Sequence, residues 1–506
     1  RFVKVTFENC HADTDGSCVY IDDVTSAWVA SARGKDVSLN IRIIETCFEN
    51  CGNTDCDGGC IYVQNIMEQD RIIFDRCYAY NCKAKNGGFI YDNDVYDTHL
   101  NGSGNTVICD CYASDHGGAV YSDSCEEIIG FLFADNYAAN SGGAIYIESS
   151  RLVRKIMDCR FYRNGSGNGG SAVWTGSNAT ISGCAFLENN GYEVYTDNNN
   201  AEIKNSTFWT QNAGGSTHTN IKNGNAVEKT YAEAVLPEEG DDYVINDTSD
   251  WDALYMLVKC HDINTRPDND FHGKNIILKN DISVCTSVGV LDASTLAKDF
   301  RGTFDGQDHT VFAAMSTDET GCGLFGSAYG ASIHNVTVKG IIRGDHHVGG
   351  IAGNAEACDI DHCTNYATVI GLSGSYGGII GESFNSRVMN CKNYGIIKPA
   401  EVSLTTQYAA KHAVRGPYIG KITDGVVPTN RKYSEMLGFA KDATVSWNFD
   451  APKTLEKIRK EEAQKLEEWQ KEQKKKERKG EAVDSIMPVT PMSLKINPSS
   501  SLDPDS

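Results

Sequence analysis

The chain has 506 residues, with 68 Asp and Glu against 46 Lys and Arg, so its formal net charge at pH 7 is −22. Apolar residues make up 40% of the sequence and Gly contributes 49 residues, which is too much core-forming material for a disordered chain. The acidic balance argues against a nucleic-acid or anionic-membrane partner, because both require clustered positive charge. No apolar run approaches the roughly 20 residues of a membrane-spanning helix, so no transmembrane segment is expected.

A repeat dominates the first 210 residues. Seven aromatic residues each end a short triplet with strand character: Tyr20, Tyr62, Tyr91, Tyr121, Tyr146, Trp174 and Tyr195. Pairs of Gly precede five of these triplets. A second motif, Phe-x-x-Asn, lies upstream and is plainest as FADN at 133–136, FYRN at 161–164 and FLEN at 186–189.

The segments between the turn residues are short, β-branched and aromatic, with alternating polarity, which is typical of strands. A period of roughly 21 to 30 residues with several such strands predicts one coil of a parallel β-helix, each coil stacking on the last at about 4.8 Å. All 10 Pro residues lie at Pro237 or later, as expected where every backbone N–H joins a ladder. We predict an all-β, right-handed parallel β-helix over residues 1–210.

Phe-x-x-Asn followed by Gly-Gly-Ala-Ile, here Gly142–Ile145, resembles the repeat pair of the polymorphic outer membrane protein family. The resemblance covers roughly residues 40–200. It implies a surface β-helix of a bacterium or protist, and it implies a role in adhesion.

Alignment of the coils predicts columns of like residues. One column of amides is expected to hold Asn9, Asn50, Asn81, Asn136, Asn164 and Asn189, with Ser114 filling the one gap. Three columns are expected among the 19 Cys: Cys10, Cys51 and Cys82; Cys18 and Cys60; and Cys109, Cys159 and Cys184, interrupted by Phe131. Stacked thiols and stacked disulfides look alike at this spacing, although a column of three cannot pair fully within itself.

A second array with a different repeat follows. Residues 211–247 lose the periodicity and are expected to form a connector. Trp251–Lys259 follows a cluster of N-cap residues and is expected to be a short helix that caps the next solenoid. Within 248–400 a glycine-rich hexapeptide recurs at intervals of 27 and 28 residues, as GCGLFG at 321–326, VGGIAG at 348–353 and YGGIIG at 376–381. This resembles the GLUG repeat, also a β-helical coil of bacterial surface proteins.

Three segments are expected beyond the second array. Residues 401–451 are expected to form a C-terminal cap region. Residues 452–480 are rich in Lys and Glu, in the Glu-before-Lys order that favours a solvated α-helix, and this helix serves either for docking or as an exposed spacer. Residues 481–506 are rich in Pro and Ser and are expected to be a disordered tail.

A polysaccharide lyase or hydrolase is the enzymatic alternative, because parallel β-helices commonly carry that chemistry. It requires two or three carboxylates on one outward face together with an Arg or Lys. Asp75, Asp110, Asp158 and Arg160 fall near one face, but they spread over three to four coils. The sequence contains no P-loop, no His-Glu-x-x-His and no Gly-x-Ser-x-Gly. We therefore predict a protein that is not an enzyme, with no catalytic residues.

Two acidic turns are the candidate metal site. Asp13 and Asp15 belong to one Asp-x-Asp-Gly string, Asp55 and Asp57 belong to another, and the alignment places both strings in successive coils. Carboxylates at one turn repel each other unless a hard cation such as Ca²⁺ lies between them. The alternative is a pair of acidic turns that face water. No cofactor is required by this reading, and Ca²⁺ is the candidate cation.

These patterns together favour an elongated extracellular or cell-surface protein that acts as an adhesin or ligand-display module. Its expected partner is a glycan or protein on a host or neighbouring cell, with docking through the 452–480 helix as a further contact. A β-helix polysaccharide-degrading enzyme and a structural scaffold component are the alternatives, because fold does not fix function.

Overall fold

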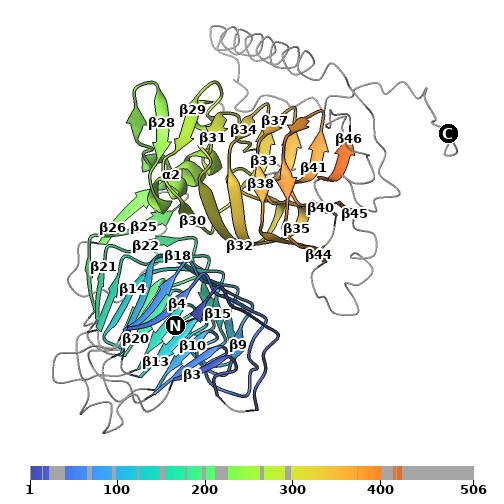
Figure 1. The fold of residues 1–506 in the computed structure, drawn as a ribbon. Helices are drawn as coiled ribbons and strands as arrows, with labels where there is room; N and C mark the ends of the chain where they lie inside the picture. Colours follow the sequence, from blue (N-terminus) through green and yellow to red (C-terminus); the bar gives the residue numbers. More distant parts are fainter. Residues whose placement is uncertain are drawn as a thin grey trace, which may run out of the picture.

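The computed structural model describes residues 2–13, 15–21, 40–64, 71–93, 98–123, 125–148, 154–176, 179–196, 201–210, 226–261, 267–290, 298–372, 374–399, 414–416 and 419–423. These residues form a parallel β-solenoid of about 11 turns, so the predicted parallel β-helix is confirmed. Figure 1 shows two arrays, one running from blue to green and the other from green to orange. The expected 452–480 helix and 481–506 tail lie outside the described residues.

Three sheets build the first array. The largest contains β1 (Phe2–Val3), β2 (Thr6–Glu8), β4 (Asn40–Ile44), β5 (Cys47–Glu49), β7 (Arg71–Asp75), β8 (Tyr78–Tyr80), β11 (His99–Cys109), β14 (Glu127–Ala134), β17 (Arg154–Met157), β18 (Arg160–Tyr162), β21 (Ala179–Ser182), β22 (Ala185–Leu187), β24 (Glu202–Lys204), β25 (Ser206–Thr210) and β26 (Ala226–Thr230). The second contains β3 (Val19–Ile21), β6 (Ile61–Val63), β10 (Ile90–Asp92), β13 (Val120–Ser122), β16 (Ile145–Ile147), β20 (Val173–Thr175) and β23 (Val194–Thr196). The third contains β9 (Lys83–Ala84), β12 (Tyr112–Ala113), β15 (Tyr137–Ala138) and β19 (Gly165–Ser166).

Three more sheets build the second array. One contains β27 (Glu238–Glu239), β28 (Asp242–Ile245), β29 (Asn275–Leu278), β31 (Thr303–Asp305), β34 (Ser332–His334), β37 (Asp359–Asp361) and β42 (Arg387–Met389). Another contains β30 (Ile282–Val284), β32 (Thr310–Cys322), β35 (Thr337–Gly349), β38 (Thr364–Asn365), β39 (Thr368–Gly371), β40 (Ser375–Gly377), β43 (Lys392–Asn393), β44 (Ile397–Pro399) and β45 (Val414–Gly416). The last contains β33 (Phe325–Tyr329), β36 (Ala352–Glu356), β41 (Ile380–Phe384) and β46 (Ile419–Thr423). The short helices are η1 (Tyr231–Glu233), α2 (Thr248–Lys259) and η2 (Pro267–Asp270).

The predicted aromatic column is confirmed in full. Successive parallel strands pair Tyr20 with Tyr62 and continue one residue per coil to Trp174 and Tyr195. Inside the array a second aromatic stack joins the Phe residues of the Phe-x-x-Asn motif, and the rings of Phe161 and Phe186 lie 4.8 Å apart and fully buried. Each such ring contributes about 2–3 kcal/mol by its removal from water, so the motif is first of all a core motif.

Two columns side by side mark the turn that follows β2, β5, β8, β11, β14, β18 and β22. The corner column has left-handed backbone and consists of Asn9, Asn50, Asn81, Asp110, Asp135, Arg163 and Glu188. The inner column is one residue later and consists of Cys10, Cys51, Cys82, Cys111, Asn136, Asn164 and Asn189. The single Asn ladder predicted from the sequence is therefore wrong in its first half, because Asn9, Asn50 and Asn81 occupy the corner and Cys111, rather than Ser114, fills the inner position.

The Cys columns are confirmed in part. The inner column holds Cys10, Cys51 and Cys82 as predicted, and the backbone N–H of Cys18 donates to the carbonyl of Cys60 at 3.0 Å. In the third column the order along the array is Phe131, Cys159 and Cys184. Cys109 pairs with Ala134 instead, so it does not belong to this column. All 19 Cys are free thiols.

Within the predicted connector, the structure describes residues 226–247, and these include strands. Residues 226–230 form β26, which extends the first array, and 242–245 form β28, which starts the second. Helix α2 begins at Thr248, with the Asp247 side chain capping it by accepting from two backbone N–H groups. Its Trp251 is fully buried against Phe rings of the second array, as expected of a capping helix.

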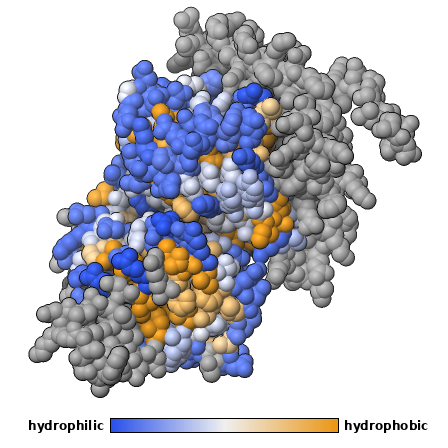
Figure 2. Space-filling view, in the orientation of Figure 1, coloured by the Kyte–Doolittle hydropathy of each residue, from blue (hydrophilic) through white to orange (hydrophobic). Residues whose placement is uncertain are grey.

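One hydrophobic core crosses the junction. Outward-facing side chains of the first array, among them Tyr162 and Leu187, pack in the same cluster as α2 and the interior of the second array. The interior of the first array is a separate cluster. Figure 2 shows apolar side chains gathered around the N-terminus, where the first coil leaves the core partly open. In the part of the chain that the structure describes, no helix has the length and apolar character needed to cross a membrane.

Candidate functional site

A cleft of about 500 Å³ lies between the two arrays. The first array, α2 and the second array all contribute side chains to its walls: Asp110, Asp135, Arg163, Glu188, Tyr255, Cys285, Ser287, Met315, Ser316, Thr317 and Arg343. A drug-sized or disaccharide-sized ligand fits a volume of this order. The cleft is also strongly polar, since five of its side chains carry an ionisable acid or a guanidinium.

The corner column supplies one whole wall. Asp110, Asp135, Arg163 and Glu188 follow one another, one per coil, and each has a positive φ between 50° and 57°. Left-handed backbone costs non-glycine residues roughly 1 kcal/mol or more, least for Asn and Asp, so Arg163 and Glu188 are held there by the coil. The repeat thus places four charged side chains, one per coil, on the wall of the cleft that faces the second array.

Asp135 and Arg163 form the centre of this wall. The Arg163 guanidinium donates through Nε to one Asp135 oxygen at 2.8 Å and through Nη2 to the other at 2.9 Å. The same Nη2 donates to the carbonyl of Cys285 at 3.1 Å, which ties the pair to the second array. A bidentate pair of this kind fixes both side chains.

Glu188 is satisfied by donors from the junction. Its carboxylate accepts from the hydroxyls of Tyr231 and Tyr255, each at 2.9 Å, and from the ammonium of Lys259 at 2.7 Å. Lys259 also donates to the Tyr255 hydroxyl at 2.7 Å. The Tyr255 ring is thereby held as a rigid wall of the cleft.

Asp110 is an acid of the cleft whose pKa is raised. Burial raises its pKa to about 6, Arg343 opposes the shift and Asp135 adds to it. The Arg343 guanidinium lies 3.9 Å from the Asp110 carboxylate and donates to the Ser316 hydroxyl at 3.2 Å. Asp110 therefore titrates at a higher pH than an ordinary carboxyl group, in a cleft that also holds the Asp135 carboxyl group.

Of the residues predicted for the enzymatic alternative, the structure brings only Asp110 to the cleft. Arg160 instead donates to Asp252 of α2 at 2.5 Å and helps to hold the junction. Asp75 accepts from the amide of Asn105 at 3.1 Å, and Asp158 is exposed.

The two Asp-x-Asp-Gly turns lie in successive coils, as predicted. The Asp15 carboxylate accepts from the backbone N–H of Asp57 at 2.9 Å, and the Asp57 carboxylate accepts from the backbone N–H of Asn86 at 3.1 Å and from its side-chain amide at 3.0 Å. Burial raises the pKa of Asp57, and the neighbouring Asp15 adds to the shift. Asp13 and Asp55 are exposed. Backbone and amide donors thus already serve the inner two carboxylates, and Ca²⁺ binding stays a prediction.

Sequence reasoning missed most of the cleft. Asp135, Arg163 and Glu188 each stand directly before the Asn of a Phe-x-x-Asn motif, in a position where a charge is not needed for packing. A charged residue at this position in three repeats was the signal in the sequence that pointed to the cleft. The contributions of Tyr255 and Arg343 carry no such signal, because they depend on how the second array docks. Comparison of the chain with protein-family models, with curated proteins and with solved structures found no match.

Proposed function

We propose that this protein is a cell-surface β-solenoid that acts as an adhesin or display module and binds a glycan segment in the cleft between its arrays. The observation that carries the proposal is the wall of stacked carboxylates and guanidinium groups that faces a cleft of about 500 Å³. Carboxylate acceptors and guanidinium donors together match the hydroxyl groups of a sugar, and Met315 adds an apolar side chain to the lining. The cell-surface location rests on the repeat resemblance.

The charge of the chain favours a neutral or amino sugar over a uronate. The net charge is −22, and three of the cleft residues are acids. A polyanionic chain would approach against that field, whereas a neutral chain would not. A glycan on a host or neighbouring cell is the partner that this chemistry suits.

A glycan array with neutral, amino-containing and uronate-containing oligosaccharides tests the proposal. We expect neutral or amino sugars to be captured, and we expect Arg343→Met to weaken capture at least tenfold. The matched control is Arg387→Met, because Arg387 forms a similar Arg–Asp pair with Asp359 on the second array but does not line the cleft. Equal capture by both variants would place the binding surface elsewhere, and binding of a protein but of no glycan in a pull-down would favour the scaffold alternative.

Glycoside hydrolysis is the second candidate, and the pKa of about 6 at Asp110 is the observation that favours it. A carboxyl group with a raised pKa in the same cleft as a second carboxyl group, here Asp135, is the pairing that glycosidases use. Release of reducing sugar from a captured glycan, lost in Asp110→Asn while capture is retained, would establish it. Release of unsaturated ends from a uronate polysaccharide would instead indicate a lyase.

A further inference from the structure

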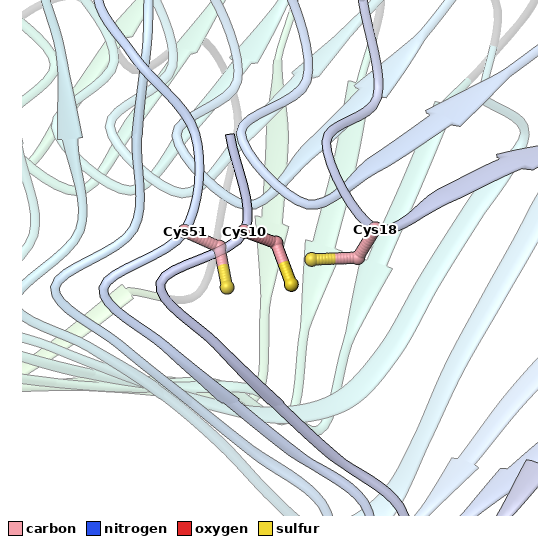
Figure 3. A group of neighbouring side chains, drawn as sticks. All are labelled: Cys10, Cys18 and Cys51. Atoms are coloured by element: carbon pink, nitrogen blue, oxygen red, sulfur yellow. The ribbon is translucent and has the colours of Figure 1, made fainter. Parts of the chain in front are cut away.

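A cluster of thiols lies in the first two coils, far from the inter-array cleft in sequence. The sulfur atoms of Cys10, Cys18 and Cys51 all lie within 4.8 Å of one another. Figure 3 shows Cys10 and Cys51 side by side on neighbouring coils, with Cys18 pointing toward them from the opposite side of the turn. Among the described residues, this is the group in which three His, Cys, Asp or Glu ligand atoms come so close.

Cys60 lies beside this group of three. Its thiol contacts those of Cys18 and Cys51, and it is fully buried. These side chains come from two columns, and only in the first two coils is there a Cys in both columns. In the third coil the two positions are Cys82 and Phe89, and in the fourth they are Cys111 and Ala119. Four thiols from the first two coils therefore lie together, and Cys82 of the third coil contacts Cys51 and Cys60.

The thiol contacts do not divide into two separate pairs, because Cys51 contacts several neighbouring thiols. Cys51 is in hydrogen-bond contact with Cys18, Cys60 and Cys82. A disulfide brings two sulfurs to about 2.05 Å and leaves the others out. A tetrahedral zinc–thiolate centre has Zn–S bonds of about 2.3 Å, so its sulfurs lie somewhat under 4 Å apart, close to the spacing of this cluster.

Access to the cluster is also suitable for an ion. Cys10 and Cys18 are half-buried at the open end of the first array, whereas Cys51 and Cys60 are buried. Phe2 and Phe7 are only partly buried at the same end, so the hydrophobic core is incompletely covered there. A bound ion would link the first coil to the second where apolar packing is weakest.

We propose that Cys10, Cys18, Cys51 and Cys60 form a tetrahedral thiolate site for Zn²⁺ that locks the first coil onto the second. Ligation exchanges the thiol protons for the metal, so the affinity for Zn²⁺ falls as the pH is lowered. The site is independent of the inter-array cleft and of the proposed glycan binding.

The test uses the full chain, reduced and kept free of oxygen, with Zn²⁺ or Co²⁺ alone as the probe. We expect one Zn²⁺ per chain to survive desalting, and Co²⁺ to give the intense thiolate charge-transfer and tetrahedral d–d absorption. Cys18→Ser and, separately, Cys10→Ser should each weaken Zn²⁺ binding at least tenfold with an unchanged far-ultraviolet circular dichroism spectrum. Either half-buried position tolerates a hydroxyl, so the two variants guard against a single folding failure.

Cys358→Ser is the matched control. Cys358 is buried, and the next coil already has Ser386 at the equivalent position, so Ser fits this column and Zn²⁺ binding should be unchanged. Two results would overturn the proposal. One is the absence of stoichiometric Zn²⁺ in the reduced wild-type chain. The other is a chain isolated without reductant whose peptide map shows Cys10 linked to Cys18, or Cys51 to Cys60, by a disulfide.

Discussion

The two halves of the first array form the same turn with different residues. In the early coils the turn has the sequence Asn-Cys, as in Asn50-Cys51 and Asn81-Cys82. The amide lies at the corner and the thiol lies inside the array. In the later coils a charged residue precedes Asn, as in Asp135-Asn136 and Arg163-Asn164. The charged side chain lies at the corner and the amide lies inside the array. The amide has moved inward by one residue.

Each half keeps an amide ladder at this turn. At the corner, the side-chain amide of Asn81 donates to the oxygen of Asn50 at 2.7 Å. In the interior, Asn136 donates to Asn164 and Asn164 donates to Asn189, both at 3.0 Å. The thiols of the early half make weaker contacts instead, such as that from Cys51 Sγ to the Glu49 carbonyl at 3.2 Å.

The position of the amide decides what its neighbour is free to do. With the amide outside, the interior position needs only a small apolar group, and the sequence places thiols there, including two members of the proposed Zn²⁺ site. With the amide inside, the corner is released from its structural role, and charged side chains occupy it and face the second array. One shift of one residue thus separates the thiol cluster from the polar cleft.

Removing an interior amide should have the largest effect. Asn164 is fully buried; its oxygen accepts from the backbone and side chain of Asn136, and its amide donates to the Phe133 carbonyl and to Asn189. Asn164→Ala leaves the buried backbone N–H of Asn136 without its acceptor and removes three further buried hydrogen bonds. An unpaired buried donor costs about 1–3 kcal/mol and each lost hydrogen bond about 1 kcal/mol, so we expect a loss of about 4 kcal/mol in the free energy of unfolding. Guanidinium denaturation measures it.

The control for that variant is taken from the other half of the same column. Cys111→Ala removes one thiol, whose S–H contacts the Cys109 carbonyl at 3.5 Å, and should cost only about 1 kcal/mol. If the two variants lose equal stability, the amide ladder has no special role and the comparison between the halves fails.

An intermediate effect is expected at the charged junction, as a function of pH. Asp252 is buried and accepts from Arg160 at 2.5 Å and from the Tyr162 hydroxyl at 2.8 Å. Burial raises its pKa from 3.8 to about 6, with Arg160 opposing the shift. The folded state therefore holds this proton more tightly than the unfolded state, so the contribution is fully present below about pH 4 and is lost as the pH rises through 6.

The measurement compares wild type with Asp252→Asn, which removes this titration. Between pH 4 and pH 7 the wild-type free energy of unfolding should fall by about 2 kcal/mol relative to the variant. Other acids with raised pKa values, such as Asp110 and Asp123, are present in both chains and cancel. A difference that does not change with pH would show that the junction does not depend on this carboxyl group.

The sequence predicts most of the solenoid because its period lies within each coil. The aromatic triplets predict the strand register without ambiguity, because only one register stacks the ring of each coil on the ring of the next. The Asn ladder is ambiguous, because Asn suits both a left-handed corner and a buried amide stack, and the letters alone do not separate Asn81 from Asn136. Only the strand register, which pairs Tyr80 with Cys109 and Cys109 with Ala134, resolves the two columns.

The cleft is harder to predict for a different reason. Its two walls come from arrays with unrelated repeats, and no periodicity within either array reports their docking. The contact from Arg163 to the Cys285 carbonyl spans 122 residues, and that from Ser283 to the Asn105 carbonyl spans 178. Such contacts depend on the packing of α2 against both arrays, which local pattern does not specify.

Extending the interior ladder by one coil should have the smallest effect and tests the comparison most directly. Cys111 already donates its backbone N–H to the Asn136 oxygen at 3.0 Å, as Asn136 does to Asn164, also at 3.0 Å. In Cys111→Asn the new amide would also reach Asn136, as Asn136 reaches Asn164. The gain of about 1 kcal/mol per hydrogen bond is partly offset by added volume, so we expect stabilisation of roughly 0.5 kcal/mol in chemical denaturation. A clear destabilisation would mean that the early coils are shaped around the thiol, and that the two halves are not interchangeable solutions to one turn.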